Sequence, residues 1–154
     1  MKFEFVDRIY NFEKYKSITG SKLISLEEYF LQRPLGFKKD FPSLLMIESL
    51  FQLGNWLIFI SSEFTKIGFI TMFFKMEILR CPSAGDKLLM NVNIESINQD
   101  KLIMSGTASI DNEIIFKGTR CFAHLVNLED YYKPEDLQVR FSEIYRPWKE
   151  VREK

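Results

Sequence analysis

The sequence predicts an α+β fold in which an antiparallel sheet wraps around one long hydrophobic helix. Three observations support this class. Residues 44–60 are almost continuously apolar, the segments on either side alternate between apolar and polar residues, and turn-forming residues separate the later segments. With 154 residues, of which 46 % are hydrophobic and 27 % charged, the chain is long enough to bury one core.

The first half of the chain predicts two short strands, a loop and the helix. We expect strands in residues 2–10 and 17–26, separated by a polar turn. Residues 28–41 are irregular and contain a proline and a glycine, so they form a loop that leads into the helix. Asp40 is the expected N-cap, and Pro42 lies in the first turn.

The second half predicts four strands joined as an antiparallel meander. Positions 88, 90, 92 and 94 are apolar and positions 91, 93 and 95 are polar, which is typical of a strand with one packed face and one solvated face. Asp111-Asn112 is a plausible two-residue hairpin turn. The four expected strands span residues 68–79, 87–97, 101–110 and 113–126.

The tail of the chain changes to a helical pattern. After Pro134, apolar residues recur at helical spacing with charges between them, namely Leu137, Phe141, Ile144 and Trp148. We expect one amphipathic helix, broken near Pro147, that packs on the domain or dimer surface; a partner-binding or tunnel-capping helix is the alternative. The predicted organisation is a domain at 1–128 and a helical extension at 129–154.

Charge and cysteine content argue against several classes of protein. The 21 basic and 21 acidic residues cancel, and no run of like charge stands out, so we expect no nucleic-acid partner. Cys81 and Cys121 make no disulfide framework and no secretion signal opens the chain, so we expect a reducing, cytoplasmic compartment. The apolar helix approaches the length of a membrane span, but Glu48, Gln52 and Asn55 interrupt it, and we expect no span.

One polar stripe runs along the apolar helix. At 100° per residue, Glu48, Gln52 and Asn55 lie within about 60° of one another. A carboxylate in a segment that reads as buried is costly unless it has a partner or a chemical task. The residues alone leave two interpretations open, which are a structural hydrogen-bond network and a catalytic carboxylate.

Several short motifs occur in register along most of the chain. They are Val6-Asp7-Arg8, Glu28-Tyr29-Phe30-Leu31, Phe41-Pro42-Ser43, Glu48-Ser49 with Gln52, Arg80 and Gly85-Asp86. In this order they resemble the motifs of the 3-hydroxyacyl-acyl-carrier-protein dehydratases, over residues 3–126. The resemblance implies the hotdog fold, in which the sheet wraps the central helix. It also implies sites built across a dimer from a histidine of one subunit and a glutamate of the other.

The resemblance assigns roles to particular residues. Glu48 matches the catalytic carboxylate. The residues implied to line the substrate site are Gln52, Asn55, Pro34, Gly36 and Ser43. No metal or cofactor is implied.

The departure from the family pattern lies at Pro34, where the catalytic histidine falls in register. Dehydration needs both an acid and a base, and Glu48 alone supplies one of them. The only histidine, His124, lies near the end of the last expected strand and reads as structural or surface. We expect a protein of fatty-acid or polyketide-type metabolism that binds a (3-hydroxy)acyl thioester. Its dehydration is either impaired alone or completed by a histidine-bearing partner subunit.

Two alternatives stay open. The first is a hotdog thioesterase in which Glu48 directs water at the thioester, so that Pro34 is harmless. The second is a non-catalytic structural subunit. Cys81 and Cys121 read as packing residues and not as nucleophiles.

The expected partners are an acyl carrier protein or a coenzyme A thioester, together with a second subunit in a homodimer or a heterodimer with a related dehydratase. Arg33, Lys38 and Lys39 lie on the loop before the helix, where they are placed to meet an acidic carrier protein. An ordinary solvated loop explains the same charges.

Overall fold

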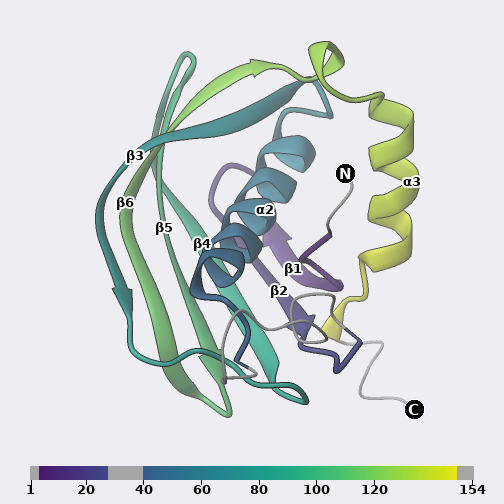
Figure 1. The fold of residues 1–154 in the computed structure, drawn as a ribbon. Helices are drawn as coiled ribbons and strands as arrows, with labels where there is room; N and C mark the ends of the chain where they lie inside the picture. The colour runs from purple at the N-terminus through teal and green to yellow at the C-terminus, as the bar shows by residue number, and fades with distance from the viewer. Residues whose placement is uncertain (1–3, 28–39, 149–154) are drawn as a thin grey trace.

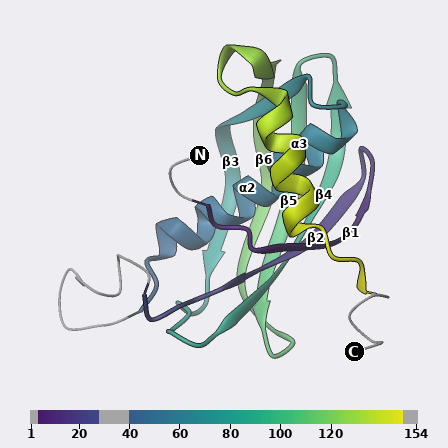
Figure 2. The same ribbon diagram turned by 90° about the vertical axis from the view of Figure 1, so that its right-hand side faces the viewer.

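The computed structural model describes residues 4–27 and 40–148. These residues form an antiparallel sheet in the order β1-β2-β4-β5-β6-β3, which curls around helix α2 (Ser43–Ser61) (Figure 1). A second helix, α3 (Pro134–Ile144), covers the side of α2 that faces away from the sheet, as Figure 2 shows from the front. The strands are β1 (Arg8–Glu13), β2 (Ser17–Leu23), β3 (Lys66–Ile78), β4 (Lys87–Asn98), β5 (Lys101–Ile110) and β6 (Glu113–Asn127).

The central helix and the last four strands begin and end within two residues of their predicted limits. The alternation in β4 is reflected in its packing, because Leu88, Met90 and Val92 are buried against the helix layer. The predicted hairpin turn is also present. Asp111 and Asn112 have φ angles of 50° and 67°, and two consecutive positive φ angles are what a type I′ turn requires.

The prediction for the first strand was wrong at both ends. β1 begins at Arg8 and continues through Glu13 into what was expected to be a turn. Residues 4–7 lie outside the strand, and this segment contacts α2 at Phe5, whose backbone N–H donates to Oε1 of Gln52 over 2.9 Å. Asp7 marks the point of departure, since its carboxylate accepts a hydrogen bond from the N–H of Leu23 over 2.7 Å.

The predicted N-cap was also wrong. Pro42 occupies the cap position of α2, and no side chain caps the helix there. Asp40 is engaged elsewhere, because its Oδ1 accepts a hydrogen bond from the hydroxyl of Ser83 over 3.2 Å. The N–H of Phe41 donates to the carbonyl of Pro82 over 2.7 Å. These bonds tie the entry to α2 to the connection between β3 and β4.

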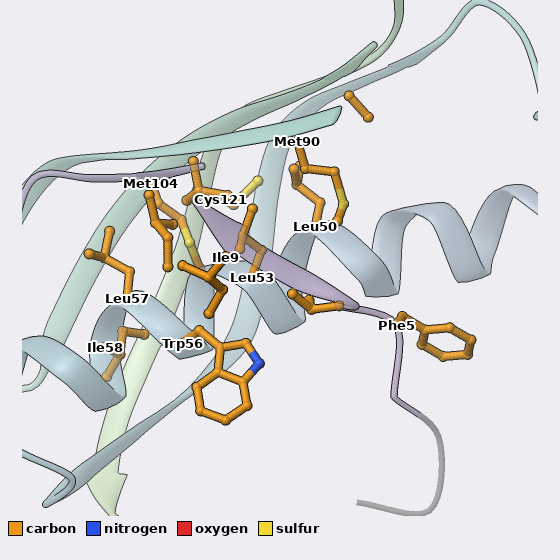
Figure 3. Close-up of a cluster of buried hydrophobic side chains, with 14 of the residues drawn as sticks. Phe5, Ile9, Leu50, Leu53, Trp56, Leu57, Ile58, Met90, Met104 and Cys121 are labelled. Carbon is orange, nitrogen blue, oxygen red and sulfur yellow. The ribbon is translucent and has the colours of Figure 1, made fainter. Parts of the chain in front are cut away.

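The core lies between α2 and the concave face of the sheet. Leu50, Leu53 and Leu57 of the helix pack with Met90 and Met104 of the strands (Figure 3). α2 is long and apolar enough to cross a membrane by composition, but 61 % of its apolar window is buried inside the domain. In this fold α2 is therefore the core helix around which the sheet is built.

The amphipathic helix predicted after Pro134 is present and ends at Ile144, before Pro147. An aromatic cluster holds it against the domain. Phe141 stacks on Tyr145 with ring centroids 5.1 Å apart, and it contacts Trp56 of α2 at 6.2 Å. Such ring pairs add stability beyond the area they bury. α3 is thereby fixed over the outer side of α2.

The two edges of the sheet differ. Tyr145 forms a parallel bridge with Ile9 of β1, and the N–H of Arg146 donates to the carbonyl of Ile9 over 2.8 Å, so the tail closes that edge. Within residues 4–27 and 40–148, no segment pairs with the outer edge of β3. This edge carries a run of exposed apolar side chains, namely Phe69, Met72, Phe73, Phe74 and Ile78.

Candidate active site

Glu48 lies in the second turn of α2, and its side chain is exposed. The sequence suggested a buried carboxylate, and this expectation was wrong. Leu50 faces the sheet, and two residues of α-helix correspond to about 200°, which places Glu48 on the opposite side of the rod. α3 contacts α2 further along, at Trp56, and leaves this turn uncovered by the described residues. Glu48 is therefore accessible in the single chain.

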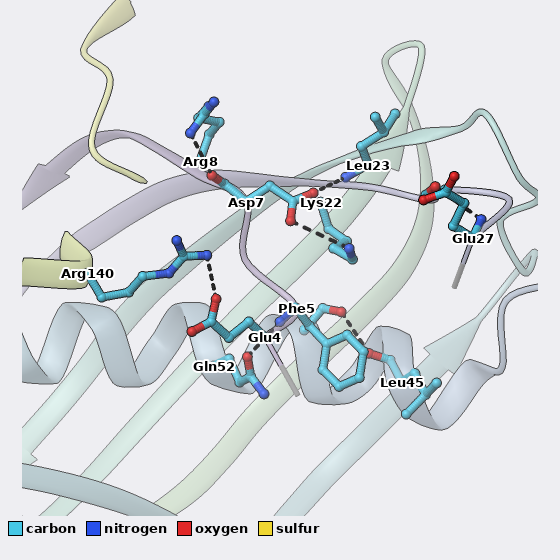
Figure 4. A network of polar contacts seen from close by, with 12 residues as sticks. Glu4, Phe5, Asp7, Arg8, Lys22, Leu23, Glu27, Leu45, Gln52 and Arg140 are labelled. Atoms are coloured by element: carbon cyan, nitrogen blue, oxygen red, sulfur yellow. Dashed lines mark hydrogen bonds and ion pairs between the residues drawn. The ribbon is translucent and has the colours of Figure 1, made fainter. Parts of the chain in front are cut away.

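Gln52 holds the carboxylate of Glu48. Its Nε2 donates to Oε1 of Glu48 over 3.0 Å, and its Oε1 accepts the N–H of Phe5 over 2.9 Å. Figure 4 shows Gln52 below the N-terminal segment, with the Phe5 contact dashed. A backbone N–H only donates, so Phe5 fixes which end of the amide faces it and turns the NH₂ group toward Glu48. Gln52 is buried, which restricts its rotation.

Asn55, the third member of the predicted stripe, has a different partner. Its Oδ1 accepts the N–H of Gly68 in β3 over 2.8 Å. Asn55 follows Glu48 by seven residues, which is about two helical turns, so both lie on the same face. The structure therefore joins Glu48 to Gln52 by a hydrogen bond, whereas Asn55, on the same face of α2, bonds to the backbone of β3.

The remaining predicted substrate-binding residues are only partly described. Ser43 is the first residue of α2 and is half-buried. Pro34 and Gly36 lie outside the described residues, as does the loop with Arg33, Lys38 and Lys39. Their place beside Glu48 stays a prediction.

Two other titratable residues lie on β6. His124 is exposed and pairs in register with Phe69 of β3 and Lys101 of β5. Cys121 is buried, and burial, with a smaller contribution from the charge of Glu95, raises the pKa of its thiol to about 11. A thiol with this pKa is almost fully protonated at neutral pH, so Cys121 is unsuited to be a nucleophile.

Sequence reasoning missed Phe5 as part of the site. Its contribution is a backbone N–H, which no side-chain pattern reports. The Val-Asp-Arg motif that follows it was the available signal, because Asp7 ties the segment to Leu23 and thereby sets the path of Phe5.

The arrangement provides one oriented carboxylate. Gln52 holds Oε1 of Glu48, and no hydrogen bond from the described residues engages Oε2. Such a group accepts or donates one proton, or directs one water molecule, at a bound substrate. A reaction that needs both an acid and a base requires a second group beside Glu48.

Comparisons with known proteins identify the family of this chain. A family model described as the FabA-like domain matches residues 1–119. The 3-hydroxyacyl-acyl-carrier-protein dehydratase FabZ of Buchnera aphidicola subsp. Acyrthosiphon pisum (strain Tuc7) is 32 % identical over 124 residues, covering 79 % of this chain and 82 % of the relative. The FabZ of Yersinia enterocolitica is 28 % identical over 148 residues, covering 94 % and 84 %.

Solved structures share the architecture. The protein smu.793 from Streptococcus mutans UA159, bound to acetyl CoA, is similar with a TM-score of 0.60 at 14 % identity, over 78 % of this chain and 88 % of that one. The fluoroacetyl-CoA thioesterase FlK has a TM-score of 0.63 at 12 % identity, over 84 % and 96 %. At such identities these likenesses establish the fold alone, and the family follows from the sequence matches. The chain belongs to the FabA-like family and has the hotdog fold.

Proposed function

We propose that this protein binds a 3-hydroxyacyl thioester and supplies Glu48 to a dehydratase site that a histidine-bearing partner subunit completes. The observation that carries the proposal is an exposed carboxylate on the core helix that is nevertheless held in place by a buried amide. The named relatives are 3-hydroxyacyl-acyl-carrier-protein dehydratases, which suggests the substrate class.

The missing partner group follows from the chemistry. Removal of water from a 3-hydroxyacyl chain requires a base for the proton beside the thioester carbonyl and an acid for the departing hydroxyl. Glu48 serves one of these duties, and Pro34, in the histidine's register, serves neither. Loss of one of two cooperating groups typically removes roughly 10²- to 10⁴-fold of the rate. The protein alone is therefore expected to be a poor dehydratase.

The open edge of β3 is the proposed interface. An unpaired edge with exposed apolar side chains invites the addition of a strand from another chain. Glu48 lies on the same face of α2 as Asn55, which bonds to β3, so we expect a subunit bound at this edge to reach Glu48. The partner is a histidine-bearing relative of this chain, and the thioester is carried by an acyl carrier protein or coenzyme A.

The test compares the protein alone with the protein co-expressed with a histidine-bearing FabZ-type subunit. Each preparation receives 3-hydroxyacyl thioesters, and the products are separated by mass. We expect the mixed complex to release water, the chain alone to be at least about 100-fold slower, and Glu48→Gln to lower the rate of the mixed complex by roughly 10²-fold or more. The matched control is Glu63→Gln, which neutralises an exposed glutamate beyond the other end of α2.

The products distinguish the competing functions. Dehydration by the isolated chain that depends on Glu48 would refute the proposed need for a partner. Release of the free acid would identify a thioesterase, and a mixed complex that is unaffected by Glu48→Gln would leave Glu48 without a catalytic role.

A further inference from the structure

We propose that helix α3 holds the side chain of Glu48 in place through the N-terminal segment, with Arg140 as the positioning residue. This inference rests on the proposed function of Glu48 and extends it to a part of the chain beyond the residues 1–119 that match the family model. The connection runs from α3 to Glu4, from the adjacent Phe5 to Gln52, and from Gln52 to Glu48.

The first step is an ion pair between Arg140 of α3 and the carboxylate of Glu4, drawn at the left of Figure 4. The two side chains are 33 % and 41 % exposed, so water weakens the pair without abolishing it. They bridge a crevice of about 160 Å³ between α3 and the N-terminal segment, which Trp56 and Leu137 also line. In this crevice a charged contact takes the place of close packing.

The second step is the N-terminal segment itself. Asp7 anchors its far end, through the N–H of Leu23 and the ammonium group of Lys22 at 3.5 Å. Phe5 lies between the anchors, is 4 % exposed, and packs its ring against Phe41 at 6.1 Å. A short extended segment held at both ends has little freedom to move its backbone, so the Glu4 anchor helps to keep the N–H of Phe5 aimed at α2.

The third step carries this position to the carboxylate. The N–H of Phe5 fixes the amide of Gln52, and the other end of that amide donates to Glu48. If Glu4 is released, the Phe5 N–H moves away from Oε1 of Gln52, the amide gains rotational freedom, and Glu48 loses its oriented donor. Arg140 thus acts on the carboxylate without touching it.

α3 can serve as the fixed point because its own attachment does not depend on Arg140. Phe141 and Tyr145 pack against Phe12 and Trp56, with ring centroids between 5.4 and 6.2 Å apart. Removal of the guanidinium group is therefore expected to leave α3 docked and the domain folded.

The experiment measures amide hydrogen exchange by NMR in the full chain. For Arg140→Gln we expect the Phe5 N–H to exchange about two- to fivefold faster, which is the range for a partly exposed ion pair. The side-chain NH₂ signal of Gln52 should shift with it. Arg140→Lys should restore both readouts, and Glu4→Gln should reproduce the Arg140→Gln result. Glu143→Gln, which removes the other carboxylate at 3.0 Å from Arg140, is the matched control and should change neither.

Phe5 exchange that stays at the wild-type rate in both Arg140→Gln and Glu4→Gln would overturn the inference. Faster exchange of the Phe5 N–H with an unchanged chemical shift of the Gln52 NH₂ group would also overturn it. In that case the effect of Arg140 would reach the N-terminal segment but not Gln52. In the mixed complex, kcat should fall two- to fivefold with KM unchanged. A wild-type mixed complex without dehydration would refute the proposed function, while the exchange data, which need no substrate, decide the positioning role separately.

Discussion

The β3 edge offers the sharpest test of assembly, through Phe74→Lys. Phe74 is 73 % exposed in the single chain, so its replacement removes little from the core and should leave the fold intact. If a second subunit pairs along β3, this side chain becomes buried in the interface, where a lysine ammonium would lose its hydration.

The magnitude follows from the exposed fraction. Full burial of a phenylalanine side chain is worth about 1.5–3 kcal/mol. Covering a 73 % exposed ring is therefore worth roughly 1–2 kcal/mol for each Phe74 in the interface. In a symmetric pair of two copies of this chain the residue counts twice. The variant should then lose roughly 2–4 kcal/mol of association free energy, which corresponds to a 30- to 700-fold larger dissociation constant. Desolvation of the lysine adds to this, so the range is a lower bound.

Sedimentation velocity over a dilution series of the purified chain measures the effect, with the urea midpoint as the check on folding. Val139→Lys is the matched control, because Val139 is exposed on α3, on the other side of α2 from the sheet. Equal dissociation constants for wild type and Phe74→Lys would refute strand pairing at β3. A loss of dimer in the Val139→Lys control would refute it as well, since α3 would then be the interface.

Two further predictions concern stability. A Cβ at position 20 would lie 2.7 Å from the carbonyl oxygen of Arg8 and 2.7 Å from a methyl group of Leu53. Gly20→Ala should therefore lower the free energy of unfolding by about 1–3 kcal/mol. An unchanged urea midpoint would contradict this close approach around Gly20. The second prediction concerns Cys121, whose thiol has a pKa of 9.0 in the unfolded chain and about 11 in the folded protein. Between these pH values the unfolded state binds fewer protons than the folded state. The free energy of unfolding therefore falls as pH rises, by up to about 1.4 kcal/mol per pH unit. Urea unfolding at pH 8 and pH 10 should show a smaller fall for Cys121→Ala than for wild type, and equal falls would contradict a raised pKa.

The sequence predicted those elements whose local pattern and tertiary environment agree. In β4 one face is apolar and the same face packs, and Asp111-Asn112 favours the turn that the hairpin needs. The helical spacing of Leu137, Phe141 and Ile144 likewise predicted α3. The surface that α3 covers was not predictable, because an apolar stripe indicates which face of a helix is buried but not which element it packs against.

The failures share a physical cause, which is competition from distant groups. Asp40 suits an N-cap by residue type, but Ser83 offers its carboxylate a hydrogen bond. The strand expected from residue 2 is pulled off the sheet at Phe5 by Gln52. Glu48 was expected to be buried because its neighbours in the sequence are apolar. Its exposure depends instead on which faces of α2 the sheet and α3 cover. None of these competitors lies within a local sequence window.

The closure of β1 by Tyr145 and Arg146 also has a consequence for synthesis. These residues leave the ribosome after every strand of the sheet, so a nascent chain that has already formed the described sheet holds two unpaired edges until Tyr145 and Arg146 have been made and have docked. During this interval an identical nascent chain on the same messenger can pair with either edge, and a chain with two open edges can extend into a polymer. Docking of the tail at Ile9 leaves β3 as the open edge of the described sheet, and a chain with one open edge cannot extend into a polymer by edge pairing.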